Sequence, residues 1–273
     1  MPGKTRADLL LVEQGLAKSR ETAQRLILAG QARLGMERVA KSSQMIDRAV
    51  QLSVDKPFSY VSRGALKLIK ALDVFGVDVN GTTAMDIGAS TGGFTEVLLE
   101  RGASCVYSID VGYGQLADKI RRDERVRVME RTNARFITPD MFDLKPKLTV
   151  IDVSFISIKL LLDTIFHIMG SDGRLIALIK PQFEAGRGHV GKGGIVRQPG
   201  DHVQVLMDVA NAAEEKGFRT RRITYSPIKG QTGNIEFLFD IMSMTNNALY
   251  GKITNADIEA VVIDAHAVLN IKA

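Results

Sequence analysis

The sequence has few residues that form covalent cross-links or hold metal ions. Cysteine occurs once, at Cys105, so no intrachain disulfide is possible and a reducing compartment is consistent with the sequence. Because Cys105 falls within a predicted buried strand, we expect a packed thiol rather than a reactive one. The four histidines are scattered, and no His/Cys cluster has the spacing of metal ligands. We therefore expect no bound metal.

Long apolar runs are also missing. The longest apolar stretch, residues 148–166, is interrupted by Asp152, Lys159 and Asp163 and does not predict a membrane span. The charged residues 1–6 are not followed by an apolar stretch long enough for a secretion signal. From these two absences we expect a cytoplasmic protein with no membrane partner. We also expect a monomer.

The charge is uneven along the chain of 273 residues, whose composition, 45% hydrophobic and 25% charged, is that of an ordinary globular protein. The net charge is +5, and residues 1–59 contain ten Lys and Arg against six Asp and Glu. A basic small domain before a nearly neutral larger one is typical of a polyanion-binding module attached to a catalytic body. The length fits one large domain with a small module, or two domains.

The first 55 residues predict a small helical module. Residues 6–14 form a helix that Gly15 ends, and Ser19 caps a second helix that Gly30 closes. This helix pair, with the words LAKSRETAQRLILAG and strand-like pieces after it, resembles the RNA-binding module of ribosomal small-subunit protein S-four, although residues 32–36 depart from its V-x-V-N-G turn. The resemblance implies that basic side chains contact RNA phosphates, namely Arg6, Lys18, Arg20 and Arg25. A basic helical hairpin without an RNA role is the alternative.

The glycine spacing of a dinucleotide site is missing too, because G-x-G-x-x-G would need glycine where the chain has Ser90. An apolar strand-like run, residues 82–87, instead leads through Gly88 and the pair Gly92-Gly93 into a helical pattern. This D-x-G-x-x-x-G-G form resembles motif one of S-adenosylmethionine (SAM) methyltransferases. Asp110, 24 residues after Asp86, ends the next apolar run, where a ribose-binding carboxylate is expected. An ordinary strand-to-helix turn is the alternative.

We therefore expect SAM as the cofactor. Asp86 closes its strand, where a carboxylate can accept a hydrogen bond from the ligand, and Tyr113 follows Asp110 in a loop where its ring can stack on adenine. The motif and its likeness to methyltransferases predict the following cofactor-binding residues: Asp86, Gly88, Ala89, Ser90, Thr91, Gly92, Gly93, Phe94, Asp110, Val111, Asn133 and Asp152.

Strand-like and helical patterns alternate after residue 60, which predicts an α/β fold. We expect a Rossmann-like, seven-stranded methyltransferase sheet with helices on both faces, preceded by a small α+β RNA-binding domain. The predicted strands cover residues 82–87, 106–110, 125–129, 148–153, 174–179, 220–225 and 235–239, and the predicted helices residues 62–75, 95–101, 156–169, 201–216 and 256–269. The predicted domains are residues 1–59, residues 60–245, and a C-terminal helix in residues 246–273 that packs on the second domain.

Two charged residues stand at the ends of predicted apolar strands, Asp152 and Lys180, and a charge there lies in the ligand crevice of a parallel sheet. They belong to a series of sequence motifs: YVSRGALKL, DIGASTGGFTEVLLERGA, DVGYGQL, ERTNAR, DVSFISI, KPQFEAGRG and GNIEFLF. These motifs resemble the TlyA (hemolysin A) family of ribosomal RNA 2′-O-methyltransferases, relatives of the FtsJ-type ribose methyltransferases. The resemblance implies a catalytic tetrad at Lys67, Asp152, Lys180 and Glu236.

The chemistry of ribose methylation explains these residue types. A ribose 2′-hydroxyl is a poor acid, so it must be oriented and partly deprotonated as it attacks the sulfonium methyl group. We expect Lys180 to act as the base, since a neighbouring lysine and desolvation both favour the neutral amine. Asp152 and Glu236 then hold the two lysines in position, and Lys67 steers the hydroxyl or the RNA backbone.

The loop at residues 185–200 has six glycines and four candidate cations but no acidic residue. Such a composition suits a mobile loop that grips RNA phosphates, although a plain connector fits as well. Outside the N-terminal module we expect RNA contacts from Arg63, Arg187, Lys192 and Arg197.

The resemblance implies a substrate within ribosomal subunits, a cytidine ribose of large-subunit RNA and also one of the small subunit. Two rival functions belong to other classes. One is a membrane-lytic hemolysin, for which the chain offers no barrel repeat or span. The other is a non-catalytic ribosome-binding factor, against which the complete tetrad argues. A small-molecule methyltransferase would need neither the basic module nor the glycine-rich loop.

Overall fold

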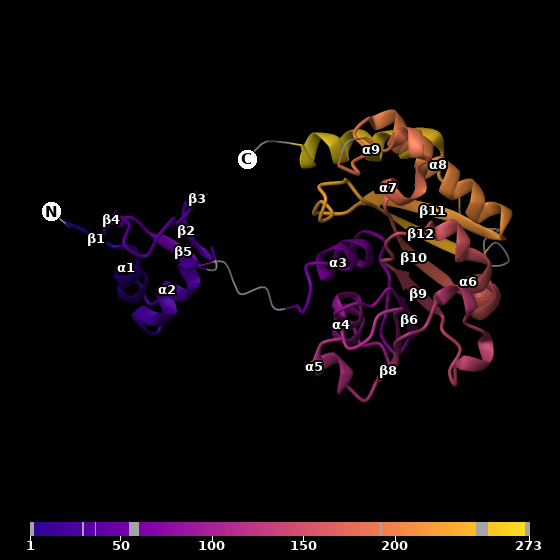
Figure 1. The fold of residues 1–273 in the computed structure, drawn as a ribbon, viewed down its shortest axis with the longest axis horizontal. Helices are drawn as coiled ribbons and strands as arrows, with labels where there is room; N and C mark the ends of the chain where they lie inside the picture. The colour runs from indigo at the N-terminus through magenta and orange to yellow at the C-terminus, as the bar shows by residue number, and fades with distance from the viewer. Residues whose placement is uncertain are drawn as a thin grey trace. The chain divides into compact units, whose positions relative to one another are not determined.

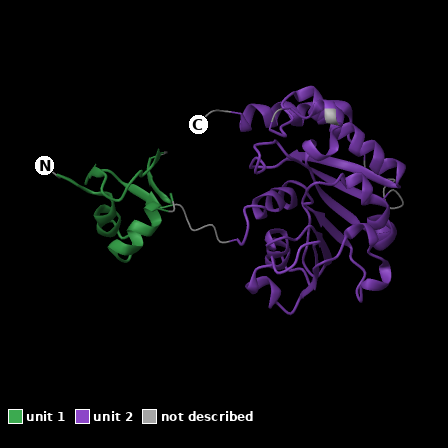
Figure 2. Ribbon diagram, viewed as in Figure 1, with its two compact units in different colours: residues 1–59 green, residues 60–273 purple. Residues whose placement is uncertain are grey.

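The computed structural model describes residues 3–28, 30–35, 37–54, 60–191, 193–243 and 251–270. The chain divides into two compact units, residues 1–59 and residues 60–273 (Figure 2). The linker expected at residues 56–59 lies outside the described residues, as does most of the segment between the expected second and third domains, residues 244–250. In the described part the C-terminal helix belongs to the second unit.

Unit 1 contains a helix pair beside two small sheets. The helices are α1 (Ala7–Glu13) and α2 (Arg20–Leu28). One sheet pairs β1 (Lys4–Arg6) with β4 (Met45–Asp47), and the other has the order β3 (Glu37–Arg38), β2 (Ala32–Leu34), β5 (Leu52–Val54). The predicted cap is present, since Ser19 Oγ accepts a hydrogen bond from Thr22 N at 3.2 Å. The apolar sides of both helices and the strands enclose a small core around Leu10, Leu11 and Ile27.

Unit 2 is built on a seven-stranded sheet with the order β11-β12-β10-β9-β6-β7-β8 (Figure 1). Every described pairing is parallel except those of β12, which runs antiparallel to both β10 and β11. The expected seven-stranded methyltransferase fold is thus confirmed. The strands are β6 (Thr83–Ile87), β7 (Cys105–Ile109), β8 (Val126–Met129), β9 (Leu148–Ile151), β10 (Arg174–Ile179), β11 (Phe218–Tyr225) and β12 (Phe237–Ser243).

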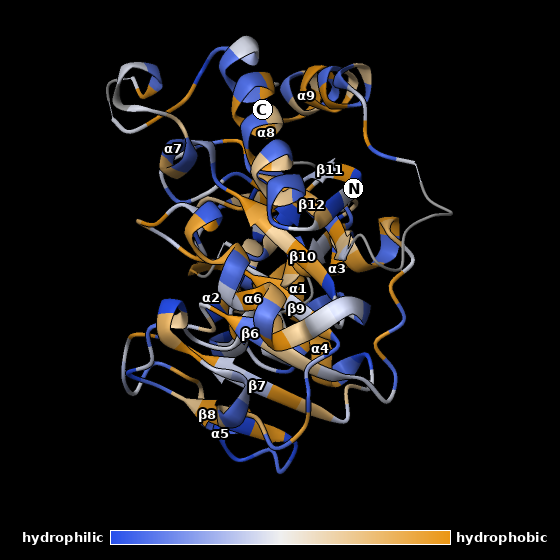
Figure 3. Ribbon diagram, turned by 90° about the vertical axis from the view of Figure 1, so that its right-hand side faces the viewer, coloured by the Kyte–Doolittle hydropathy of each residue, from blue (hydrophilic) through white to orange (hydrophobic). Residues whose placement is uncertain are grey.

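Helices cover both faces of this sheet because its strand residues point alternately into two cores. Ala84 packs into a core with α3 and α4, whereas its neighbour Met85 packs into a core with α6, α8 and α9. Figure 3 shows the central strands β9 and β10 as largely hydrophobic. The helices are α3 (Ala65–Val74), α4 (Gly93–Glu100), α5 (Asp118–Arg121), α6 (Leu162–Met169), α7 (Pro181–Glu184), α8 (Pro199–Glu215) and α9 (Asn255–Leu269).

Several predicted boundaries of elements were wrong. Ser62 does not cap α3, because its Oγ accepts from Gly64 N at 3.0 Å and the helix begins after Gly64. The cap of α9 is Thr254 rather than Asn255, since Thr254 and Asp257 form a reciprocal capping box. The last strand begins only at Phe237. Local patterns place such ends poorly because caps depend on side-chain geometry.

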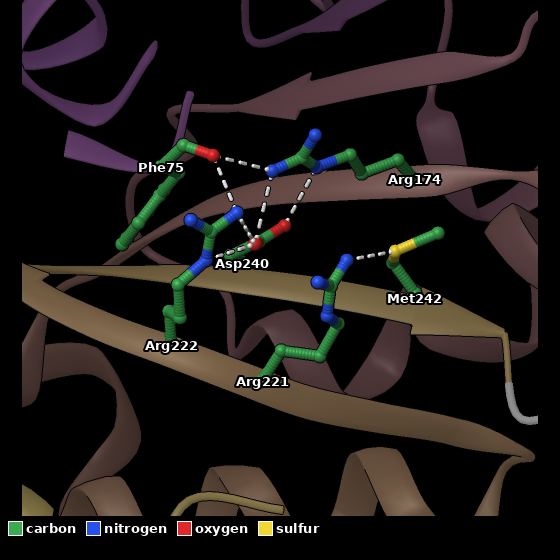
Figure 4. A network of polar contacts seen from close by, with 6 residues as sticks. All are labelled: Phe75, Arg174, Arg221, Arg222, Asp240 and Met242. Atoms are coloured by element: carbon green, nitrogen blue, oxygen red, sulfur yellow. Dashed lines mark hydrogen bonds and ion pairs between the residues drawn. The ribbon is translucent and has the colours of Figure 1, made fainter. Parts of the chain in front are cut away.

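An ion-pair network ties the end of α3 to the sheet. Asp240, on β12, is fully buried and accepts hydrogen bonds from Arg174 Nε at 2.8 Å and from Arg222 Nη2 at 2.8 Å. Both guanidinium groups also donate to the carbonyl oxygen of Phe75, the residue after α3, with Arg174 Nη2 at 3.1 Å. Figure 4 shows both groups converging on the Asp240 carboxylate and the Phe75 carbonyl. The network therefore joins β10, β11 and β12 to the helix that carries Lys67.

A histidine pair joins α8 to α9. The His202 side chain is fully buried, and its Nδ1 lies 2.9 Å from His266 Nε2. Burial lowers the pKa of His202 from 6.5 to about 4, and the His266 ring adds to this effect. Nearby Asp201 opposes it. The folded protein therefore favours the neutral His202 ring.

Because of this pair, we expect the free energy of unfolding to fall in acid. Between pH 6.5 and pH 4 the unfolded His202 binds a proton that the folded protein excludes, so the free energy of unfolding falls as the pH falls. His202 alone contributes about 3 kcal/mol over this window. Denaturant unfolding at pH 7 and pH 4 should show this contribution missing in His202→Gln. The exposed His167→Gln serves as the control, and an equal pH dependence in His202→Gln and wild type would contradict the prediction.

Candidate active site

The four residues of the expected tetrad lie together at one edge of the sheet. Lys67 Nζ is 2.6 Å from Glu236 Oε2 and 3.9 Å from Asp152 Oδ2, and Lys180 Nζ is 2.6 Å from Asp152 Oδ1. Asp152 follows β9 and Lys180 follows β10, so both stand at the carboxyl ends of parallel strands. Asp152 therefore lies between the two ammonium groups and Glu236 pairs with one of them.

Glu236 enters this edge from the opposite direction. It stands just before β12, and because β12 is antiparallel to β10, its beginning lies beside the carboxyl end of β10. Glu236 is only 2% exposed, and burial raises the pKa of its carboxyl while Lys67 opposes the shift. A Cβ atom at Gly230 would lie 2.4 Å from Glu236 Oε1, so a side chain there would displace the carboxylate.

Lys67 is more buried than helical periodicity indicates. It lies off the predicted apolar stripe of α3, yet it is 8% exposed. The side of α3 that looks polar in sequence faces the site, where carboxylates compensate the buried charge. Ser154 was not predicted, and its Oγ accepts a hydrogen bond from Lys180 Nζ at 2.8 Å. Its place two residues after Asp152 was the available signal.

A cavity of about 920 Å³ opens at the tetrad and extends along the glycine turn. Seven of the expected cofactor-binding residues line it: Gly88, Ala89, Ser90, Thr91, Gly93, Phe94 and Asp152. Gly88 has φ +86°, and a Cβ atom there would lie 2.4 Å from the carbonyl oxygen of Asp152. The turn therefore needs glycine both for its backbone conformation and for its close contact with the backbone of Asp152, the residue after β9.

Asp110 fixes the shape of this turn. Its Oδ2 accepts from Ser90 N at 2.8 Å and its Oδ1 accepts from Gly112 N at 2.7 Å. A carboxylate has about four lone-pair sites, so each oxygen still has room for a hydroxyl donor. The position is compatible with ribose binding, which remains a prediction.

Asp86 does not match its predicted position. Its side chain is fully buried beneath the turn, Thr95 Oγ1 donates to its Oδ2 at 2.6 Å, and it does not line the cavity. Burial raises the pKa of Asp86 to about 7. The pattern was misleading because an alternating strand points its penultimate residue into the core between the sheet and α4. The Asp86 carboxylate therefore cannot accept a hydrogen bond from a ligand in the cavity.

The remaining expected cofactor residues lie outside the cavity lining. Val111 is exposed, and the Asn133 side chain accepts from Arg135 N, which caps a short 3-10 helix, Ala134–Phe136. The Tyr113 ring is exposed, with the Arg131 guanidinium 4.0 Å from its centre. Gly92 is buried below the turn. Cofactor binding by Val111 and Asn133 and stacking of Tyr113 on adenine remain predictions.

Two aromatic residues at the cavity were missed from sequence. Phe155 is 91% exposed with φ +65°, a rare conformation for a bulky residue, and its ring centre lies 5.2 Å from that of Phe183. Both rings line the cavity. Glu184 holds this loop, because it accepts from Ser157 Oγ at 2.6 Å and from Ile158 N at 2.7 Å. The available signal in the sequence was an aromatic residue three positions after each strand-end charge, Asp152 and Lys180.

In unit 1, two of the expected RNA-binding residues are tied to a buried carboxylate. Asp8 is fully buried and accepts from Arg6 Nη2 at 2.9 Å, Arg20 Nε at 3.0 Å and Gln24 Nε2 at 3.0 Å. The Arg6 guanidinium beside it holds the pKa of Asp8 well below its usual range. Asp8 therefore fixes both arginines and neutralises part of their charge, which the sequence did not indicate. Their free N–H groups can still donate to a phosphate.

The other expected RNA-binding residues lie on exposed surface where they are described. Lys18 and Arg25 are exposed in unit 1, and Arg63 and Arg197 in unit 2, with Arg63 lining the cavity. Lys192 and the side chain of Arg187 lie outside the described part of the chain. These RNA contacts remain predictions.

In the part of the chain that the structure describes, no three or more His, Cys, Asp and Glu residues gather in a way that could hold a metal ion. No helix over the described ranges is long and apolar enough to cross a bilayer.

Residues 60–265 match the family described as FtsJ-like methyltransferase. The chain is 46% identical to the Bacillus subtilis protein YqxC, a candidate rRNA methyltransferase, over 98% of this chain and 96% of that one. It is 43% identical to the Mycobacterium tuberculosis 16S/23S rRNA (cytidine-2'-O)-methyltransferase TlyA, over 92% and 95%. A solved candidate hemolysin from Streptococcus thermophilus matches with TM-score 0.77 and 42% identity, over 99% and 98%. With the fold and the assembled tetrad, these matches establish that the chain belongs to the FtsJ-like methyltransferase family.

Proposed function

We propose that this protein transfers the methyl group of SAM to a ribose 2′-hydroxyl, that of a cytidine in ribosomal RNA. The observation that carries the proposal is the arrangement of Lys67, Asp152, Lys180 and Glu236 around one cavity that also reaches the glycine turn. A small-molecule acceptor would need neither the basic unit 1 nor the glycine-rich loop at residues 185–200. The relatives named above carry rRNA methyltransferase names, one of them for cytidine.

The residues of the glycine turn fit SAM as the cofactor. SAM supplies an electrophilic methyl group on a sulfonium. Gly88 leaves bare backbone beside the cavity, and Asp152 adds a carboxylate to the cavity wall that could compensate a positive charge on the cofactor. Asp110 is oriented by two backbone N–H groups and can accept ribose hydroxyls. Asp86 supports the turn from below through Thr95.

In this mechanism Lys180 takes the proton from the attacking 2′-hydroxyl at its Nζ. Asp152 and Ser154 fix that nitrogen from two directions, at 2.6 and 2.8 Å. Lys67, held by Glu236, is left to orient the hydroxyl or the adjoining phosphate. Most of the rate enhancement then comes from holding the hydroxyl in line with the methyl group.

A transfer assay tests the proposal directly. Ribosomal subunits that lack 2′-O-methylation are incubated with the full-length protein and tritiated SAM, and the labelled nucleoside is identified after digestion. We expect the label in 2′-O-methylcytidine. Label on a base, or on protein, would reject the ribose acceptor. Subunit binding without transfer would support the non-catalytic ribosome-binding rival, and lysis of erythrocytes without SAM would revive the hemolysin rival. If ribosomal RNA is the substrate, the protein acts in the cytoplasm.

We further propose that Phe155 stacks on the target base once the nucleotide has left its helix. An exposed ring held at φ +65° beside Phe183 is a ready platform for a flat base. Phe155→Ala should lower transfer at limiting subunit concentration about five- to hundredfold, because stacking contributes roughly 1–3 kcal/mol per base. Phe155→Tyr keeps the ring and should retain most activity. Unchanged SAM binding in both variants is required, and wild-type transfer by Phe155→Ala would refute the stacking role.

A further inference from the structure

A second cavity lies next to the candidate active site. It encloses about 370 Å³ between the segment around Arg197, the segment from Lys229 to Ile235, and the end of α9 at His266 and Asn270. Lys229 lines both this cavity and the larger one at the tetrad. Lys229 therefore stands between a ligand in the second cavity and the cavity that holds the tetrad.

The charges around the second cavity have one sign. Two of the residues that line it, Arg197 and Lys229, are cations, and none of its lining residues is acidic. Two like charges that share a cavity repel each other unless an anion or solvent lies between them. This balance favours an anionic ligand.

The Lys229 side chain takes part in a chain of hydrogen bonds that ends at α8. Its Nζ donates to Asn270 Oδ1 at 2.8 Å, and Asn270 Nδ2 lies 3.1 Å from His266 Nδ1. The His266 Nε2 lies 2.9 Å from Nδ1 of the buried His202. Because the Asn270 amide nitrogen is a donor, His266 accepts at Nδ1 and donates from Nε2 to His202. These hydrogen bonds link Lys229 through Asn270 and His266, at the end of α9, to His202 on α8. They use one of the three N–H donors of Lys229.

We propose that the second cavity binds a phosphate of the RNA strand, the phosphodiester that flanks the methylated nucleotide, through Lys229 and Arg197. The inference rests on the proposed function, because an RNA strand with its ribose at the tetrad always carries a phosphate next to that ribose. A fixed cation on that phosphate sets how far the strand enters the cavity. Lys229 was not predicted from sequence as an RNA contact.

The test compares Lys229→Ala, Arg197→Ala and the double variant with wild type in the tritiated-SAM assay on unmethylated subunits. The double variant should raise KM for subunits about tenfold, with kcat within about twofold. The dependence of log KM on log salt concentration should become shallower by roughly one for each lost phosphate contact. Lys216→Ala is the matched control, since it removes an exposed positive charge at the far end of α8. It should change neither quantity.

Each result has a defined meaning. If the double variant has the same KM and salt dependence as the wild-type protein, the proposal is wrong. The proposed function would still stand, provided that the wild-type protein methylates subunits. Weaker SAM binding in the double variant, measured by titration calorimetry, also overturns it, because the anion would then be the methionine carboxylate of SAM. A lower kcat with unchanged KM would assign Lys229 to the reaction rather than to RNA binding. If wild type methylates no subunit, the proposed function fails first.

Discussion

Lys180→Met is expected to reduce methyl transfer to ribosomal subunits by about a hundred- to ten-thousandfold, the range typical for loss of a general base. Methionine has a similar length but no nitrogen to accept the 2′-hydroxyl proton. It also leaves Asp152 without the ammonium group that lies 2.6 Å away. SAM binding should stay within about threefold of wild type, because the glycine turn is untouched. Single-turnover kinetics with saturating SAM measure the chemical step separately from product release.

The matched control for this experiment is Lys145→Met. Lys145 is half exposed and pairs with Asp172 at 3.4 Å, away from the cavity lining, so its loss should leave transfer unchanged. Lys180→Arg adds a useful comparison, since arginine keeps the positive charge but does not deprotonate in proteins. If Lys180→Arg transfers methyl groups at nearly the wild-type rate, a cation rather than a base is needed at this position. Full activity of Lys180→Met would remove Lys180 from the mechanism altogether.

Asp240→Ala is expected to cost about 3–5 kcal/mol of unfolding free energy, the range for removing one partner of a buried ion pair. Asp240 is fully buried, and its removal leaves the guanidinium group of Arg174 without its carboxylate partner. Arg222 loses the same partner. Denaturant unfolding followed by circular dichroism measures the change.

Two variants bracket this result. Asp73→Ala removes a half-exposed carboxylate that pairs with Arg101, and it should cost about 1 kcal/mol or less. Asp240→Asn keeps the shape and one acceptor oxygen, so it should fall between the two. A cost below about 1 kcal/mol for Asp240→Ala would mean that solvent replaces the carboxylate without loss, contrary to its burial.

The sheet and the glycine turn could be predicted because they depend on local patterns. Alternating apolar runs and glycine positions mark strands and turns within a few residues of one another. The tetrad could be proposed because its motifs resemble those of the TlyA family, and two of its members, Asp152 and Lys180, also stand at the ends of predicted strands. That Lys67 would be buried could not be inferred, because its burial depends on which side of α3 faces the sheet.

The contacts that were missed join segments far apart in the chain. Asp8 gathers Arg6, Arg20 and Gln24, and Asp240 gathers two arginines and the end of α3. Each carboxylate stands within an apolar run, but the sequence does not show which distant side chains it pairs with. Asp86 was misassigned for the opposite reason: its motif is clear, but strand alternation turns the side chain away from the cavity.

The antiparallel direction of β12 has a consequence for the order in which the protein matures during synthesis. Lys67 leaves the ribosome early, whereas its carboxylate partner, Glu236, is made more than 160 residues later. Until β12 inserts between β10 and β11, Lys67 has only the more distant carboxylate of Asp152, at 3.9 Å, to compensate its charge. Insertion of β12 thus completes the sheet and brings Glu236 to Lys67 in the same step. A chain interrupted before that segment would emerge with its glycine turn but without a working centre.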